Sequence, residues 1–194
     1  MASHPNVKIM IADAMGTDWG TVLDAEPWSM VSNLPYNISV PLILDLLGSA
    51  PAIGRYLVMV QREVGERLVA VAGEDAYGAV SVRVAYRADA RIVRDVPAEV
   101  FWPKPKVGSA LVRLVPHEPP VDVDRDALFR VVDEGFAERR KTFLNGLRRL
   151  GLDKAAALGV MHACGLDPAV RAERLGLVDL AGVTRELLAT GWRP

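Results

Sequence analysis

The stretch Asn33-Leu34-Pro35-Tyr36 combines the groups needed to hold a flat heterocycle that carries an exocyclic amine. The Asn33 side-chain oxygen and the Leu34 carbonyl can each accept a hydrogen bond from such an amine, which localises a lone pair otherwise delocalised into the ring. Pro35 fixes the turn, and Tyr36 offers a face on which a base stacks. This chemistry suits transfer of a methyl group from an electrophilic donor to the amine. The alternative is an ordinary strand-to-helix turn with a buried tyrosine, because Asn-x-Pro is common in turns.

The flanking sequence predicts how this stretch is positioned. A hydrophobic run from Trp28 to Val31 leads into it, and a helical pattern from Ile38 to Leu47 follows it. A strand, a polar loop and a helix in this order place the four residues at the carboxyl end of a strand, where open α/β sheets bind ligands. The other predicted strands are 7–11, 55–60, 90–96 and 110–115, and a further helix is predicted at 61–71. The segment 78–87 is ambiguous, because its alternating apolar residues also fit a strand.

Composition excludes several classes of protein. The chain has 194 residues, of which 51% are hydrophobic and 24% charged, with a net charge of −1, which is ordinary for a soluble globular protein. No apolar run approaches the length of a membrane span, and the start of the sequence lacks the pattern of a secretory signal. The single cysteine, Cys164, excludes an internal disulfide and fits a reducing compartment such as the cytoplasm. The three histidines are scattered and give no metal-binding spacing.

The last third of the chain predicts a small helical domain. The proline-rich segment 116–120 reads as a linker. Helices are predicted from Arg125 to Ala137, with Asp124 as the N-cap, over 141–150, from Asp153 to just before Gly165, and over 180–190. Five basic residues and one acidic residue lie within 136–150. Such a local basic patch suits contact with RNA, and a solvated helix face explains it about as well.

The chain resembles the ribosomal small-subunit RNA adenine dimethyltransferases. The resemblance runs from about Val7 to Leu188 and is carried by motifs that follow the Asn33–Tyr36 stretch in a fixed order. They are Gln61-Arg62-Glu63-Val64 with Arg67 and Leu68, Tyr77-Gly78, Ser81-Val82, Phe101-x-Pro103-x-Pro105-Lys106-Val107-x-Ser109-Ala110, Phe136-Ala137-x-Arg139-Arg140-Lys141-Thr142-x-x-Asn145-x-Leu147 and Arg171-Ala172-Glu173-x-Leu175. The first motif together with the motif at Phe101 is highly specific at this spacing.

This resemblance implies a fold and an activity. The fold is a class I methyltransferase-like Rossmann sheet of order 3-2-1-4-5-7-6 followed by a helical domain, with 78–87 as a helix. The implied domains are a partial methyltransferase domain at 1–116, a linker at 117–124 and an rRNA-docking domain at 125–194. The implied activity is transfer of methyl groups from S-adenosylmethionine to the N6 atoms of unpaired adenines in small-subunit rRNA, within a pre-ribosomal particle in the cytoplasm, with no role for a metal or a membrane.

The resemblance also assigns roles to individual residues. Asn33, Leu34, Pro35 and Tyr36 form the catalytic motif, and Asp13 and Asn33 contact the cofactor. Phe101, Lys104 and Lys106 lie in a loop near the target base. Arg139, Arg140, Lys141, Arg148 and Arg149 are the expected contacts to RNA phosphates.

One departure from the family pattern concerns the cofactor. No G-x-G-x-x-G sequence follows a strand anywhere in this chain. We therefore expect a chain truncated at its N-terminus, without the first two strands of the sheet and without half of the donor site. The competing hypotheses are a non-catalytic rRNA-binding or ribosome-assembly protein, and one part of a split gene or a mis-set start.

The expected truncation also has a structural consequence. It would leave 28–32 as an unpaired edge, so that the strand at 7–11 moves beside it, a second polypeptide completes the sheet, or the first thirty residues lose order.

Overall fold

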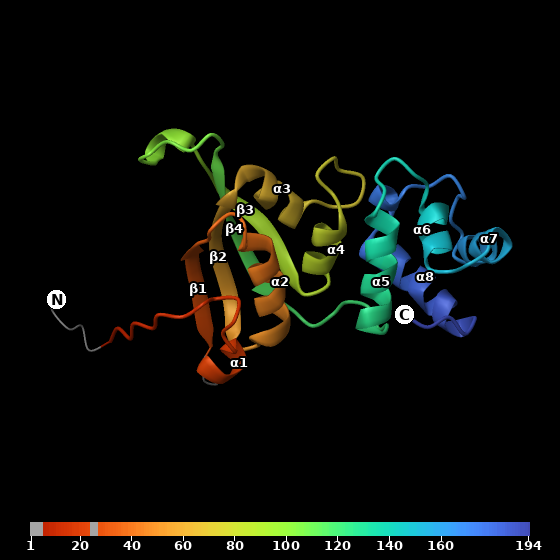
Figure 1. The fold of residues 1–194 in the computed structure, drawn as a ribbon, viewed down its shortest axis with the longest axis horizontal. Helices are drawn as coiled ribbons and strands as arrows, with labels where there is room; N and C mark the ends of the chain where they lie inside the picture. Colours follow the sequence, from red (N-terminus) through yellow and green to blue (C-terminus); the bar gives the residue numbers. More distant parts are fainter. Residues whose placement is uncertain (1–5, 24–26) are drawn as a thin grey trace.

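The computed structural model describes residues 6–23 and 27–194, and its centre is a four-stranded sheet (Figure 1). The strands are β1 (Trp28–Asn33), β2 (Ile53–Gln61), β3 (Ala88–Val96) and β4 (Ser109–Pro116), in the order β1-β2-β4-β3. β1 and β2 are parallel, whereas β4 is antiparallel to both of its neighbours. This order corresponds to the fourth, fifth, seventh and sixth strands of the expected sheet, so the fold class is confirmed.

The helices of this half are α1 (Trp19–Val22), α2 (Ser39–Ser49), α3 (Arg62–Val69) and α4 (Ala79–Ala85). Alternation along β2 shows which face is covered: Tyr56, Val58 and Val60 are buried in the core formed with α2 and α3. Leu57 and Met59 point to the opposite face, are partly exposed and belong to neither hydrophobic core.

The helix at 78–87 is confirmed, although its alternating valines also fit a strand. Ser81 is buried, and its hydroxyl donates to the Arg67 carbonyl at 2.6 Å and accepts from the Gly78 amide at 3.1 Å. Val82, Val84 and Tyr86 are all buried, on two sides of the helix. The stabilisation from tertiary packing on both sides of this helix therefore outweighs the local preference of the valines for a strand.

The predicted helical domain is also present. Its helices are α5 (Arg125–Phe136), α6 (Phe143–Arg149), α7 (Lys154–Ala163) and α8 (Leu177–Ala189), with a short 3₁₀ turn at Ala172–Arg174. A second 3₁₀ turn, Ala98–Val100, lies between β3 and β4. Asp124 and Asp153 cap α5 and α7 by accepting hydrogen bonds of 2.8 Å from backbone amides three residues on. Gly165 ends α7 with a φ of +66°, and the Leu166 amide donates to the Met161 carbonyl, which is a Schellman ending.

Helix α4 joins the two halves of the molecule. Val84 belongs to the core of the sheet, whereas Val82 and Tyr86 belong to the core of the helical domain. The Tyr77 hydroxyl donates to the Leu175 carbonyl at 2.9 Å. Arg83 adds hydrogen bonds of 2.7 and 2.8 Å to the two carboxylate oxygens of Asp133 on α5. The segment at 117–124 therefore connects two units that also pack directly against each other.

The predicted strand at Val7–Ile11 is wrong. This segment has no secondary structure, and its apolar side chains are exposed, with Ile9 at 80% and Ile11 at 99%. It does not move beside β1, and in the described part of the chain β1 is hydrogen-bonded to a strand on one side only. A strand needs a neighbour for its backbone groups, and Val7–Ile11 is paired with no described strand. Residues 24–26, which come shortly before β1, lie outside the described residues.

Candidate active site

The stretch Asn33–Tyr36 lies where predicted, at the carboxyl end of β1. The Leu34 amide donates to the Met59 carbonyl of β2 at 3.2 Å, which extends the pairing one residue beyond the strand. The Leu34 side chain is 4% exposed and anchors the loop in the core. The Pro35 carbonyl then accepts from the Ile38 amide at 3.2 Å, and this turn leads into α2. These contacts leave the side chains of Asn33 and Tyr36 at the surface.

Two hydrogen-bond acceptors remain available in this loop. Within the described residues, no protein donor is bonded to the Asn33 side-chain oxygen or to the Leu34 carbonyl. Both groups are anchored by the same short segment, whose backbone is tied to β2 and α2. The role of these two acceptors toward an exocyclic amine stays a prediction.

A hollow of about 390 Å³ brings the two most specific motifs together. It is lined by Asn33, Leu34, Pro35, Tyr36, Phe101, Trp102, Pro103 and Pro105. Phe101 thus lies beside the Asn33–Tyr36 stretch, although the two are far apart in the chain. Trp102 lines the same hollow and is 97% exposed. Sequence reasoning did not select Trp102 as a site residue, although an aromatic next to Phe101 in a proline-stiffened loop is a usable signal for stacking.

The two lysines of this loop do not line the hollow. Lys104 forms an ion pair with Glu99 at 2.7 Å, and its hydrogen bond lowers the pKa of the Glu99 carboxyl below its usual range. Lys106 is exposed and has no ion pair within the described residues. Their proposed contact with RNA therefore concerns phosphates at the rim and not the base itself.

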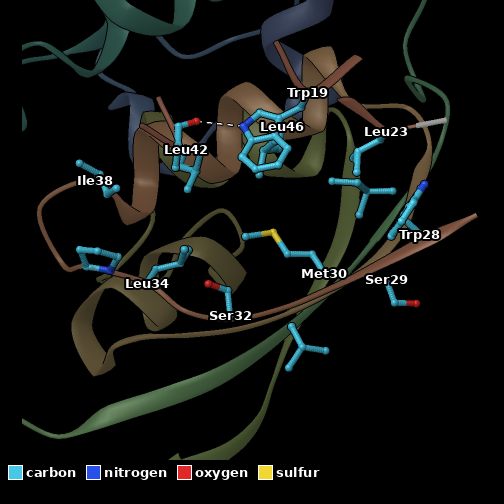
Figure 2. A pocket seen from close by; sticks show the side chains of 14 residues that line it. Trp19, Leu23, Trp28, Ser29, Met30, Ser32, Leu34, Ile38, Leu42 and Leu46 are labelled. Atoms are coloured by element: carbon cyan, nitrogen blue, oxygen red, sulfur yellow. Dashed lines mark hydrogen bonds between the residues drawn. The ribbon is translucent and has the colours of Figure 1, made fainter. Parts of the chain in front are cut away.

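A second hollow, of about 450 Å³, lies on the helix side of β1 (Figure 2). Apolar side chains from α1, β1 and α2 line it, among them Trp19, Met30, Leu42 and Leu46. The Trp19 indole donates to the Ala14 carbonyl at 2.9 Å, which closes one wall (Figure 2). Leu34 and Pro35 line both hollows. Two separate ligands can therefore meet at this motif, one from each side.

Asp13 lies near this second hollow, because the next residue in the chain, Ala14, lines the hollow. The Asp13 side chain is exposed, and its Oδ1 accepts from the Met15 amide at 2.9 Å. No described residue is bonded to its Oδ2, so this oxygen can accept from an adenine amine. An apolar hollow therefore lies close to a carboxylate oxygen that has no hydrogen-bond partner among the described residues.

The predicted phosphate contacts fall into two groups. Arg149 is partly buried and pairs with Glu134 at 3.1 Å and Glu138 at 2.6 Å, so its guanidinium is already engaged. Arg139 donates to the Asp75 carbonyl at 2.8 Å. The remaining three, which are Arg140, Lys141 and Arg148, are exposed and have no ion pair within the described residues.

Two kinds of feature are missing from the described residues. No described helix is long and apolar enough to cross a bilayer. Within the same residues, no three of His, Cys, Asp and Glu are grouped in a way that could hold a metal ion.

Comparison with known families agrees with this geometry. A family model described as "Ribosomal RNA adenine dimethylase" matches residues 1–181. The chain belongs to this family. It is 42% identical over 191 residues to ribosomal RNA small subunit methyltransferase A of Cutibacterium acnes, covering 95% of this chain and 63% of the relative. It is also 42% identical to the protein of the same name from Thermobifida fusca, covering 91% and 61%. The chain thus spans about three fifths of the length of these relatives.

Solved structures of two similar proteins confirm the fold of this family member. A dimethyladenosine transferase from Plasmodium falciparum superimposes with a TM-score of 0.79 at 24% identity, over 96% of this chain and 74% of that one. The 23S rRNA methyltransferase ErmE gives a TM-score of 0.65 at 21% identity, over 95% and 73%. At these identities the likeness establishes the architecture of the sheet and the helical domain.

Proposed function

We propose that this member of the family takes part in methylation of the N6 atoms of unpaired adenines in small-subunit rRNA, on a maturing ribosomal particle in the cytoplasm. The observation that carries the proposal is the hollow in which Tyr36 and Phe101 lie beside the free acceptors of Asn33 and Leu34. A base extruded from an RNA loop fits between the aromatic side chains. Family membership supports the same reaction.

The residues of this chain act on the acceptor amine. Stacking against Tyr36 and Phe101 fixes the plane of the base, and Pro35 keeps the loop in the shape that presents both acceptors. The Asn33 oxygen and the Leu34 carbonyl accept the two amine hydrogens, so the lone pair is directed out of the ring system toward the second hollow. Catalysis then rests on positioning and on hydrogen bonds aimed at the developing charge.

The methyl donor in this proposal is S-adenosylmethionine, which supplies an already activated methyl group. Asp13 and the apolar hollow beside β1 are the groups of this chain that would hold its adenine. From Ser29 to Asn33, β1 pairs with no described strand on the side away from β2, and residues of this part line the hollow. We propose that a second polypeptide supplies a strand there together with the remaining donor contacts.

The decisive test joins this chain to the part of the Cutibacterium acnes relative that lies outside the matched region. We expect the fusion to form dimethyladenosine in unmethylated small-subunit particles, as measured by mass spectrometry of digested rRNA. The chain alone should bind S-adenosylmethionine more weakly than micromolar in calorimetry, because several hydrogen bonds are missing. An inactive fusion, alongside an active relative under the same conditions, would contradict the proposed reaction.

A non-catalytic rRNA-binding or assembly role is the second candidate. The exposed cations Arg140, Lys141 and Arg148 of the helical domain favour it, since RNA docking through them does not depend on the methyl donor. The fusion discriminates between the two candidates. A binding protein would attach to the particle in both forms and would leave its adenines unmodified.

RNA docking is tested separately through the exposed cations of the helical domain. Replacing Arg140, Lys141 and Arg148 by Ala removes up to three phosphate contacts. The slope of log affinity against log salt should then flatten by about two to three units, measured by fluorescence anisotropy with a small-subunit rRNA fragment. Lys154→Ala, an exposed cation at the start of α7, is the matched control and should change the slope little. An unchanged slope in the triple variant would show that these three cations form a solvated helix face that does not contact RNA.

A further inference from the structure

Tyr36 is held at its hydroxyl by a residue from a distant part of the chain. The Tyr36 phenol oxygen lies 3.1 Å from the Ser109 hydroxyl, and the two residues are 73 positions apart. Tyr36 is 37% exposed, whereas Ser109 is 1% exposed. This hydrogen bond is the only side-chain bond that ties the Asn33–Tyr36 loop to β4 in the described part of the chain.

Ser109 is fixed by its surroundings. It is the first residue of β4, and it pairs with Gln61 of β2 on one side and with Val96 of β3 on the other. The preceding carbonyl, that of Gly108, accepts from the Arg62 amide at 3.0 Å. The hydroxyl of Ser109 is therefore carried by backbone that is anchored on both sides and at the start of α3.

Tyr36, by contrast, lies in a loop, and its ring projects toward the surface. Its backbone carbonyl accepts from the Ser39 hydroxyl at 3.1 Å, which ties the backbone to α2. That contact does not limit rotation of the side chain. The ring acquires a defined orientation only where its far end is held, and the far end is held by Ser109.

We propose that Ser109 is a positioning residue whose hydroxyl fixes the orientation of the Tyr36 ring for stacking with the target base. This inference rests on the proposed function, because it assigns the stacking surface for the acceptor adenine. The segment just before Ser109 carries Phe101 and Trp102, which line the same hollow. The Tyr36 ring is thus tied to the strand that follows this segment, so its part of the hollow is formed before RNA arrives and less conformational entropy is lost on binding.

The first experiment observes the ring without RNA. NMR relaxation of ring-labelled tyrosine reports the mobility of Tyr36, whose signal is assigned by its loss in Tyr36→Phe. In Ser109→Ala the Tyr36 ring should become clearly more mobile. The Tyr77 ring, whose hydroxyl donates to the Leu175 carbonyl, is the internal control and should not change. A Tyr36 ring that is equally ordered in Ser109→Ala overturns the proposal.

The second experiment is a double-mutant cycle on base stacking. The probe is a small-subunit rRNA loop with 2-aminopurine at the target adenine, whose fluorescence falls on stacking. Ser109→Ala and Tyr36→Phe should each weaken the stacked complex by about threefold to tenfold, the range expected for one hydrogen bond. The double variant should be no weaker than Tyr36→Phe, because both changes remove the same bond.

The outcomes separate the positioning role from the proposed function. If the loss of RNA affinity in the double variant equals the product of the losses in the two single variants, the proposal is overturned, since Ser109 would then act independently of the Tyr36 hydroxyl. A different outcome is that NMR shows the Tyr36 ring held by Ser109 in the native chain, while the fluorescence of 2-aminopurine never falls on binding. That result would support the contact between Ser109 and Tyr36 and would contradict base stacking in the proposed function. Tyr36→Ala, which removes the ring, sets the level of fluorescence without stacking.

Discussion

At the scale of single residues, Asn33 and Tyr36 divide the work on the target base. In the fusion with the unmatched part of the relative, Asn33→Ala should lower turnover by about a hundredfold with little change in RNA affinity, because its hydrogen bond strengthens as charge develops on the amine. Asn37→Ala, an exposed amide just beyond the motif, is the matched control and should keep normal turnover. Single-turnover kinetics and binding measured on the same variants separate the two quantities.

Tyr36→Ala should damage both quantities, because a stacked base is worth about 1–3 kcal/mol and also fixes the amine in place. Equal losses of affinity in Asn33→Ala and Tyr36→Ala, with turnover of the bound complex intact, would refute this division.

Residue types predicted part of the candidate site, and contacts decided the rest. The sequence placed Asn33 and Tyr36 at a strand end, since a strand, a polar loop and a helix have only one common arrangement in an α/β sheet. It could not show that Ser109 reaches Tyr36, because the contact depends on the register of β4 against β2. Nor could it distinguish Arg149 from its neighbours, because an arginine engaged by two glutamates and a free arginine look alike in a sequence.

At the scale of elements, two helical glycines make a matched pair. A Cβ on Gly146 of α6 would lie 2.9 Å from the Glu134 carbonyl oxygen of α5, so Gly146→Ala forces the two helices apart. We expect a loss of about 1–3 kcal/mol in the free energy of unfolding. A Cβ on Gly159 of α7 would meet nothing within 4 Å, so Gly159→Ala should raise the stability by up to about 1 kcal/mol. Urea denaturation measures both, and equal stabilities would show that the helices separate freely.

Secondary structure was predictable where an element has its own amphipathic pattern and a described neighbour. Helix α5 begins at its predicted cap Asp124, and α7 begins after Asp153, the predicted start of that helix, for this reason. Val7–Ile11 has the composition of a strand, yet a strand is not a local structure, because its backbone groups must be paired by another segment. Helix α4 shows the converse, since its alternating valines are explained only by the two cores between which it lies.

At the scale of the whole molecule, Tyr77 should make the fold sensitive to alkaline pH. Burial, with a smaller effect from the Asp179 charge, raises the pKa of Tyr77 to about 12, from an ordinary value near 10. Between these values the unfolded chain releases the proton while the folded chain keeps it, so stability that is complete below pH 10 falls as pH rises toward 12. The fall from this group is on the order of 2–3 kcal/mol.

Tyr77→Phe removes both the ionisable group and the hydrogen bond to Leu175. We expect a variant that is about 1 kcal/mol less stable at pH 8 and that loses less stability than the native chain up to pH 11. Urea titrations at each pH measure the difference. A parallel decline in both proteins would assign the alkaline sensitivity to other groups, such as Tyr56, whose pKa is also raised by burial.

Because α4 contributes to both hydrophobic cores, it connects the sheet that carries the aromatic hollow to the helical domain that carries the exposed cations. In the proposed function, an RNA docked by Arg140 and Lys141 would present its loop to Tyr36 at a high effective concentration only if the loop lies at the right separation from the docked phosphates. Selection of one adenine among many chemically identical ones would then follow from the distance between the docked phosphates and the target base.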